Sequence, residues 1–222
     1  MSRLPQSDVY GFNTRPEMGA FIPQSASSVL EVGCASGGFA LTIRGRVAPG
    51  CRIFGIDAVR SHVEAARNLG EFERVDYGYF PEDLSDQSRK YDVIVFNDVI
   101  EHVVDPWELL RSTKSFLAPG GVVVASIPNV QFLPNLVGLL RGRWDYVDEG
   151  ILDRTHVRFF TRSSVLSLFA DAGLEVTSIQ GINSIAGKVK KYRFLTLFRP
   201  VLGGTFWQQY AVVGKASSPR GD

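Results

Sequence analysis

The chain has few cysteines, no long apolar run and almost no net charge, and each absence excludes a class of protein. Its two cysteines, Cys34 and Cys51, cannot form a disulfide framework or a four-cysteine zinc site, and they favour a reducing, cytoplasmic location. No stretch reaches the about 20 apolar residues of a membrane span, and the N-terminus lacks a signal-peptide core. With 24 basic against 23 acidic residues, bulk charge gives no reason to expect a nucleic-acid partner.

What is present indicates one α/β domain. The 222 residues are 45% hydrophobic, which is enough for a sizeable core. Short apolar runs that end in Gly, Asp or Pro alternate with helical patterns, as in a parallel sheet covered by helices on both faces. The pattern therefore predicts a doubly wound α/β sheet, with early strands at 29–33, 52–57, 91–98 and 121–128 and helices at 38–48, 60–69 and 105–117.

The remaining segments are expected to frame this sheet within a single domain, 1–222. Residues 1–28 are polar and proline-containing, which suggests an N-terminal cap. Helices are predicted at 133–140, as part of a lid, and from Thr161 to Gly173. The late runs 174–182 and 206–215 are strand-like. Segments 129–161 and 183–205 are predicted to be lids or insertions.

A glycine-rich turn after the first strand predicts a bound cofactor. Gly33, Gly37 and Gly38 follow the run Val29–Val32 and open a helix, so a ligand could approach the main chain closely. About 20 residues later Asp57 ends the next strand, where a carboxylate can accept both hydroxyls of a ribose. Together these features predict an adenosine-type cofactor; the alternative is a tight turn with a surface Asp.

Glu31 separates two cofactor classes. The spacing Gly33-x-Ala35-x-x-Gly38 fits a dinucleotide fingerprint loosely, so a nicotinamide enzyme is one alternative. An acid two residues before the first glycine would repel a pyrophosphate, whereas it suits a cationic cofactor. S-adenosylmethionine carries a sulfonium and an ammonium group and no phosphate, so Glu31 favours it.

Several motifs resemble class I S-adenosylmethionine-dependent methyltransferases. They are the first loop, 30–37, the acid-bearing 55–57, the segment 97–103 and the loop 117–121. The runs 142–146 and 150–161 resemble small bacterial methyltransferases associated with polysaccharide synthesis, and ubiquinone-pathway O-methyltransferases are a more distant likeness. The resemblance implies a seven-stranded, mostly parallel Rossmann-like sheet that ends in an antiparallel hairpin.

The resemblance also implies the residues that bind S-adenosylmethionine. Glu82 or Asp83 is expected near adenine, or an aromatic ring of the run 77–83 stacks on it instead. The full set of expected cofactor-binding residues is Glu31, Gly33, Ala35, Gly37, Asp57, Ala58, Glu82, Asn97 and Asp98.

Two histidines are the candidates for catalysis. His156, in the run 153–158, and His102 could each take a proton from an attacking hydroxyl, or each could be structural. The run Asp98-x-x-Glu101-His102 resembles one that holds a divalent metal in ubiquinone-pathway relatives. The favoured alternative has no metal: the two acids meet backbone groups or the cofactor's ammonium.

The acceptor is expected to be a hydroxyl oxygen of a glycan or small molecule, on resemblance alone. The alternatives are a nicotinamide-dependent oxidoreductase and a cofactor-binding protein without turnover. Cations and aromatic residues interleave over 188–199. That stretch is a candidate contact for a membrane surface or a lipid-linked substrate, or it is an insertion packed on the sheet edge.

Overall fold

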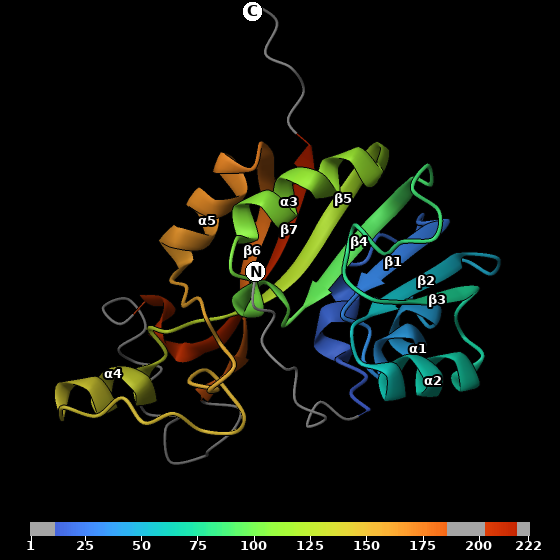
Figure 1. The fold of residues 1–222 in the computed structure, drawn as a ribbon. Coiled ribbons are helices and arrows are strands. Elements are labelled where there is room, and N and C mark those ends of the chain that lie inside the picture. The colour runs from blue at the N-terminus through green and yellow to red at the C-terminus, as the bar shows by residue number, and fades with distance from the viewer. Residues whose placement is uncertain (1–11, 186–202, 217–222) are drawn as a thin grey trace, which may run out of the picture.

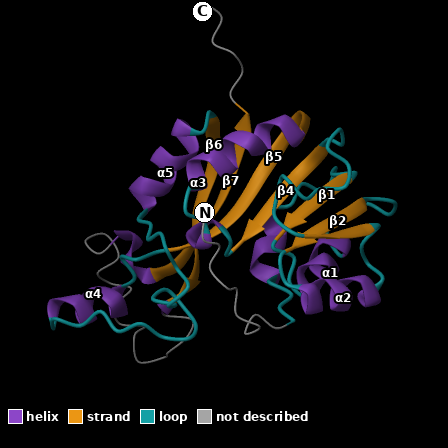
Figure 2. Ribbon diagram, viewed as in Figure 1, coloured by secondary structure: helices purple, strands orange, loops and turns teal. Residues whose placement is uncertain are grey.

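The computed structural model describes residues 12–185 and 203–216, which form a seven-stranded sheet with helices on both faces (Figures 1 and 2). The strand order is β3-β2-β1-β4-β5-β7-β6. Neighbours from β3 to β5 pair in parallel, and β7 runs antiparallel to both β5 and β6. The predicted mostly parallel sheet with an antiparallel C-terminal pair is therefore confirmed. The strands are β1 (Ser28–Val32), β2 (Arg52–Asp57), β3 (Arg74–Tyr77), β4 (Tyr91–Asn97), β5 (Leu117–Pro128), β6 (Leu174–Ser184) and β7 (Trp207–Ala216).

The α-helices of the described residues follow the predicted positions with shifted ends. They are α1 (Gly38–Arg44), α2 (Arg60–Leu69), α3 (Pro106–Thr113), α4 (Leu133–Leu140) and α5 (Arg162–Asp171). The helix expected over 38–48 ends at Arg44, because Gly45 follows. The helix expected over 105–117 ends at Thr113, and β5 begins at Leu117 instead of at 121, because Leu117 already pairs with Tyr91.

Alternate residues of the central strands are buried on opposite faces of the sheet. Leu30 belongs to a core cluster that includes Leu110 of α3 and Phe169 of α5. Its neighbour Val29 belongs to a second cluster, with Phe39 of α1 and residues of the 3₁₀ helix η1 (Pro16–Phe21). Both faces of β1 are thus covered, which explains the unbroken apolar run that marked this strand in the sequence.

The strand order also fixes where a ligand site belongs. From β1 the chain adds β2 and β3 on one side and then returns to add β4 on the other. At such a switch point the connections leave the carboxyl ends of β1 and β4 in opposite directions and open a crevice between them. Of the described helices, none has the length and apolar character needed to cross a membrane.

Candidate active site

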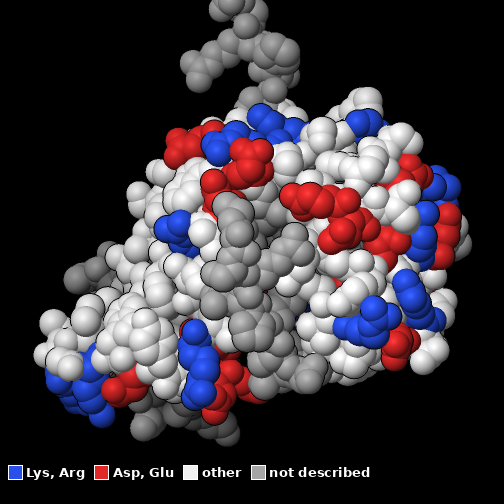
Figure 3. Space-filling view, viewed as in Figure 1, with Lys and Arg blue, Asp and Glu red and all other residues white. Residues whose placement is uncertain are grey.

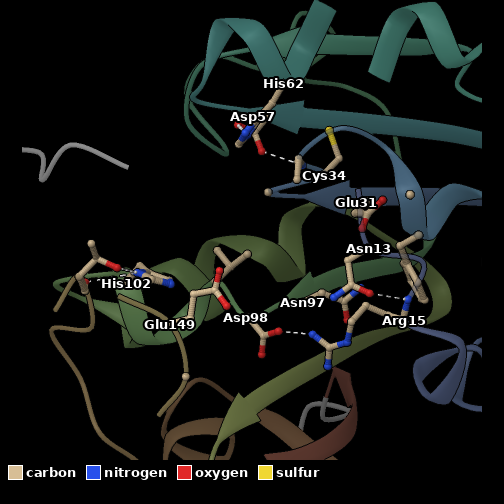
Figure 4. A pocket seen from close by; sticks show the side chains of 17 residues that line it. Asn13, Arg15, Glu31, Cys34, Asp57, His62, Asn97, Asp98, His102 and Glu149 are labelled. Atoms are coloured by element: carbon tan, nitrogen blue, oxygen red, sulfur yellow. Dashed lines mark hydrogen bonds and ion pairs between the residues drawn. The ribbon is translucent and has the colours of Figure 1, made fainter. Parts of the chain in front are cut away.

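A cavity of about 340 Å³ lies at the carboxyl ends of β1, β2 and β4 (Figure 4). A second cavity of about 130 Å³ adjoins it, since both are lined by Gly33, Asp57, Val99, His102 and Thr155. Glu149, Gly150 and Thr155 reach the first cavity from the segment after β5. The predicted cofactor residues that line at least one of the two cavities are Glu31, Gly33, Ala35, Asp57, Ala58, Asn97 and Asp98.

The glycine-rich turn brings backbone to the cavity wall. Gly33 has a φ of 71°, and a Cβ there would lie 2.6 Å from Cγ2 of Val99, so only glycine fits. Gly37, with a φ of 86°, precedes α1 and is backed by Phe72, so it shapes the turn without lining either cavity. The expectation that Gly37 contacts the cofactor directly therefore finds no support in its position.

Asp57 is held rigidly at the end of β2. Its carboxylate is buried and accepts hydrogen bonds of 2.8 Å from the backbone N–H groups of Ala35 and Val59. Nδ1 of His62 lies 3.5 Å from Oδ1. Because a carboxylate offers about four lone-pair positions, Asp57 retains acceptor capacity for ligand hydroxyls.

Glu31 and Asn97 place unsatisfied polar atoms in the cavity wall. Glu31 is 2% exposed, and Oε2 together with both side-chain heteroatoms of Asn97 has no hydrogen-bond partner. Burial, above all, raises the pKa of Glu31 to about 8. Buried polar groups are normally paired, so this arrangement is suited to a ligand that carries hydrogen-bond donors and positive charge.

Arg15 is a cavity residue that sequence reasoning missed. Its guanidinium forms an ion pair with Asp98 and donates to Oε1 of Gln209 at 3.2 Å. Asp98 also accepts hydrogen bonds from Ser126 at 3.1 Å and from Gln209 at 2.5 Å. The predicted cofactor residue Asp98 is thus tied into a network that joins the N-terminal segment to β5 and β7. No motif in the sequence marks Arg15.

The second cavity is lined by aromatic residues, not by the expected acids. Tyr79 and Phe80 face it together with Ala58. Glu82 is exposed and lines neither cavity, and Asp83 accepts a 2.8 Å hydrogen bond from the backbone N–H of Tyr79. Of the alternatives that the sequence left open for adenine, the aromatic one is brought to the cavity, and Glu82 is not.

His102 lines both cavities and has a defined orientation. Its Nδ1 lies 3.1 Å from Oγ1 and 3.3 Å from the carbonyl oxygen of Thr155. Oγ1 of Thr155 donates to Oδ1 of Asp153 at 2.7 Å, so it must accept from His102. Nδ1 therefore carries the proton and Nε2 the lone pair. Burial and the neighbouring His156 lower the pKa of His102, which keeps the ring neutral at neutral pH.

His156 occupies a different position from the one expected of a base at the cofactor. It is 7% exposed, donates from Nδ1 to the carbonyl of Ile151 at 2.9 Å, and lines a separate cavity of about 70 Å³. Nε2 lies 3.9 Å from Oε1 of Glu101, whose two carboxylate oxygens have no hydrogen-bond partner. Burial raises the pKa of Glu101 well above its usual range.

One group of potential metal ligands occurs among the described residues. Glu101, His102 and His156 each offer a ligand atom, and these atoms lie within 4.8 Å of one another. The group differs from the Asp98, Glu101 and His102 set of the sequence, because Asp98 is turned into the Arg15 network and His156 takes its place.

Comparison with known families agrees with this geometry. Residues 13–179 match the family described as a methyltransferase domain. The chain belongs to this methyltransferase family. The matched region runs from the cavity residue Asn13 into β6, so it contains the glycine-rich turn and the switch point. It also contains the histidines that line the cavities, His62, His102 and His156. The resemblance of the sequence motifs to class I methyltransferases is confirmed.

The chain is also similar in sequence to curated relatives and in fold to a solved structure. Ubiquinone biosynthesis O-methyltransferases of Coxiella burnetii and Ruegeria pomeroyi are 28% and 27% identical over 160 and 172 residues, or 70% and 74% of this chain. The matches span 66% of either relative. The fold is similar to a SAM-dependent methyltransferase from Archaeoglobus fulgidus, with a TM-score of 0.63, 20% identity and coverage of 90% of this chain and 91% of that one.

Proposed function

We propose that the protein transfers a methyl group from S-adenosylmethionine to a hydroxyl oxygen of a glycan or small-molecule acceptor. The observation that carries this proposal is the buried Glu31, whose Oε2 has no hydrogen-bond partner, beside the glycine-rich turn of a methyltransferase-family chain. The relatives are O-methyltransferases by name, which supports oxygen as the acceptor atom. The glycan class rests on the resemblance of the runs 142–146 and 150–161 alone.

The two adjoining cavities fit the cofactor. Glu31 and Asn97 would hold the ammonium group, because their unpaired oxygens accept hydrogen bonds and Glu31 can supply negative charge. Asp57 would accept the ribose hydroxyls, and the smaller cavity, lined by Ala58 and Tyr79, would take adenine. S-adenosylmethionine supplies a methyl group on a sulfonium, which is a good leaving group in an in-line displacement.

His102 is the proposed general base. It lines both cavities, and its Nε2 lone pair can accept the proton of the acceptor hydroxyl as the oxygen attacks. Thr155 and Asp153 are positioning residues, since they hold the proton on Nδ1. The chain's role is then to align the acceptor, receive its proton and exclude water with the segment around Glu149 and Thr155.

A second mechanism for activating the hydroxyl is carried by the group of Glu101, His102 and His156. A divalent ion would fit these carboxylate and imidazole donors, and it would pair the two unsatisfied oxygens of Glu101. Exhaustive chelation followed by metal analysis of the protein separates the two mechanisms. Loss of turnover that Mg²⁺ or Mn²⁺ restores supports the ion, and turnover retained by metal-free protein supports His102 acting alone.

The alternative functions predict different ligands. A nicotinamide dinucleotide would bring its pyrophosphate toward the glycine-rich turn, where Glu31 is unfavourable. A cofactor-binding protein without turnover would bind S-adenosylmethionine and leave every acceptor unmodified. The test is incubation with S-adenosylmethionine that carries a ¹³C-labelled methyl group and a panel of glycans and small hydroxyl compounds. Mass spectrometry should find the label on oxygen; an unlabelled panel despite cofactor binding favours the non-enzymatic alternative.

A further inference from the structure

Helix α4 is apolar on all sides and is not packed into the core. Asn135 is its one residue with a polar side chain, and none of its eight residues is buried. Leu139 is 53% and Leu140 88% exposed. Figure 1 shows α4 at the lower left, set apart from the sheet and its covering helices. A helix with apolar residues all round is normally buried in protein or in lipid, so this exposure calls for a partner.

Basic residues stand at the end of this helix. Arg141 and Arg143 follow α4 directly, are exposed, and form no ion pair within the described part of the chain. Figure 3 shows basic side chains gathered at the lower left, where Figure 1 places α4. Exposed leucines followed by these arginines combine apolar insertion with attraction to phosphate.

The acidic residues that follow offset this charge only in part. Asp148 forms a 2.6 Å ion pair with Arg154, and Glu149 faces the large cavity (Figure 4). Asp145 is the remaining exposed acid of the segment. Tyr146, 56% exposed, and the partly buried Trp144 add side chains of the type that occupies membrane–water interfaces.

We propose that α4, with Arg141 and Arg143, docks on an anionic phospholipid surface. The helix is about 12 Å long, which is too short to cross a bilayer and suits a position within its interface. Eight residues alone supply too little surface for the about 800 Å² per partner of a stable protein interface. The leucines enter the boundary between headgroups and acyl chains, and the two arginines contact lipid phosphates.

The chain leads from this surface directly to the cavity wall. The same segment that carries α4 goes on to Glu149, Gly150 and Thr155 of the cavity wall. A protein docked through α4 would therefore hold the large cavity close to the membrane plane. The docking itself does not rest on methyl transfer and stands or falls on lipid binding.

The test is co-sedimentation of the full chain with vesicles of phosphatidylglycerol and phosphatidylcholine, compared with pure phosphatidylcholine. The wild type should bind the anionic vesicles more strongly. Leu139→Ser with Leu140→Ser should lower binding to them by roughly tenfold or more. Arg141→Glu with Arg143→Glu should lower it by a similar factor and remove the preference for anionic vesicles.

A matched variant controls for a general loss of exposed apolar surface. Val104→Ser with Leu41→Ser changes two other exposed apolar residues, at 56% and 38%, and should leave vesicle binding unchanged. Circular dichroism of each variant verifies its fold. Absence of wild-type binding to anionic vesicles overturns the proposal, and so does equal binding by the double-leucine variant. A wild-type dimer that dissociates in that variant, without vesicle binding, would overturn it in favour of a protein interface.

Discussion

The Nδ1 atom of His102 lies 3.1 Å from the hydroxyl oxygen of Thr155, and this contact decides which nitrogen of the ring carries the proton. Thr155 is committed as a donor to Asp153 at 2.7 Å, so the histidine must donate to Thr155. The lone pair then stands on Nε2. The arrangement gives a neutral histidine the orientation that a general base requires.

Replacing His102 by Ala should lower kcat by about 10²–10⁴-fold, the usual cost of losing a general base. Affinity for S-adenosylhomocysteine should change little, because the proposed contacts of that product are made by other residues. Steady-state kinetics and calorimetry measure the two effects separately. In the wild type, kcat/KM should fall as pH falls through the pKa of His102, and that limb should lie below the ordinary pKa of about 6.5, because burial lowers it.

His156→Ala is the matched control for that prediction. His156 lines the separate, smaller cavity, so the acidic limb should persist in this variant. The limb should move to higher pH, because His156 itself lowers the pKa of His102. The sequence alone did not separate the two histidines. A large loss of kcat with a flattened pH profile in His156→Ala, and not in His102→Ala, would move the base to His156.

Thr155→Val should lower kcat by up to about tenfold, because it removes one hydrogen bond that fixes the tautomer of His102. Thr155→Ser keeps the hydroxyl and should restore most of the rate. A pH–rate profile of both variants checks the role, since a merely structural contact would leave the profile unchanged. Equal rates for Val and Ser would remove Thr155 from the positioning role.

Asp57→Ala should weaken binding of S-adenosylhomocysteine by about 1.5–3 kcal/mol, the range for a lost charge-assisted hydrogen bond. Asp76→Ala is the control, because Asp76 lies in the neighbouring strand β3 beside Ile56 and instead accepts hydrogen bonds from Ser85. Calorimetric titration of both folded variants gives the comparison. Unchanged affinity in Asp57→Ala would place the ribose elsewhere.

The sheet and part of the cofactor site were predictable from the sequence. Val29 and Leu30 are both buried, on opposite faces, so an unbroken apolar run correctly predicted a central parallel strand. Gly33 and Asp57 were identifiable because each follows from a local pattern. Gly33 comes directly after a strand, where the backbone approaches its neighbours closely, and Asp57 is an acid at the end of the next strand. The C-terminal strand pair was expected from the family resemblance.

Contacts between distant segments were not predictable. Arg15 pairs with Asp98, which lies 83 positions away in the sequence. The chain between β5 and α5 follows a path that places His156 in a separate cavity, and no local pattern predicts that path. Glu82 was assigned by register in a turn, and the turn directs it to solvent. The basic stretch 188–199 lies outside the described residues, so its expected membrane or substrate contact stays a prediction.

Glu31→Gln should stabilise the unliganded protein at pH 8 and much less at pH 5. The pKa of Glu31 is about 8 in the folded protein against an ordinary 4.5, so the folded state holds a proton that the unfolded state releases between those values. Stability from this group therefore falls as pH rises from 4.5 to 8, and glutamine removes the effect. Denaturant unfolding at both pH values measures the difference. Exposed Glu64→Gln is the control and should show no such dependence.

The most direct test of the proposed cofactor site is calorimetric titration of S-adenosylhomocysteine into the wild type and Glu31→Gln at pH 7, with NAD as the comparison ligand. We expect one site per chain and no detectable binding of NAD. We also expect proton release on binding, because the ligand's ammonium favours ionised Glu31. Glutamine at this position should weaken binding and abolish the proton release. Tight binding of NAD, or S-adenosylhomocysteine binding that is identical in the two proteins, would contradict the proposed cofactor site.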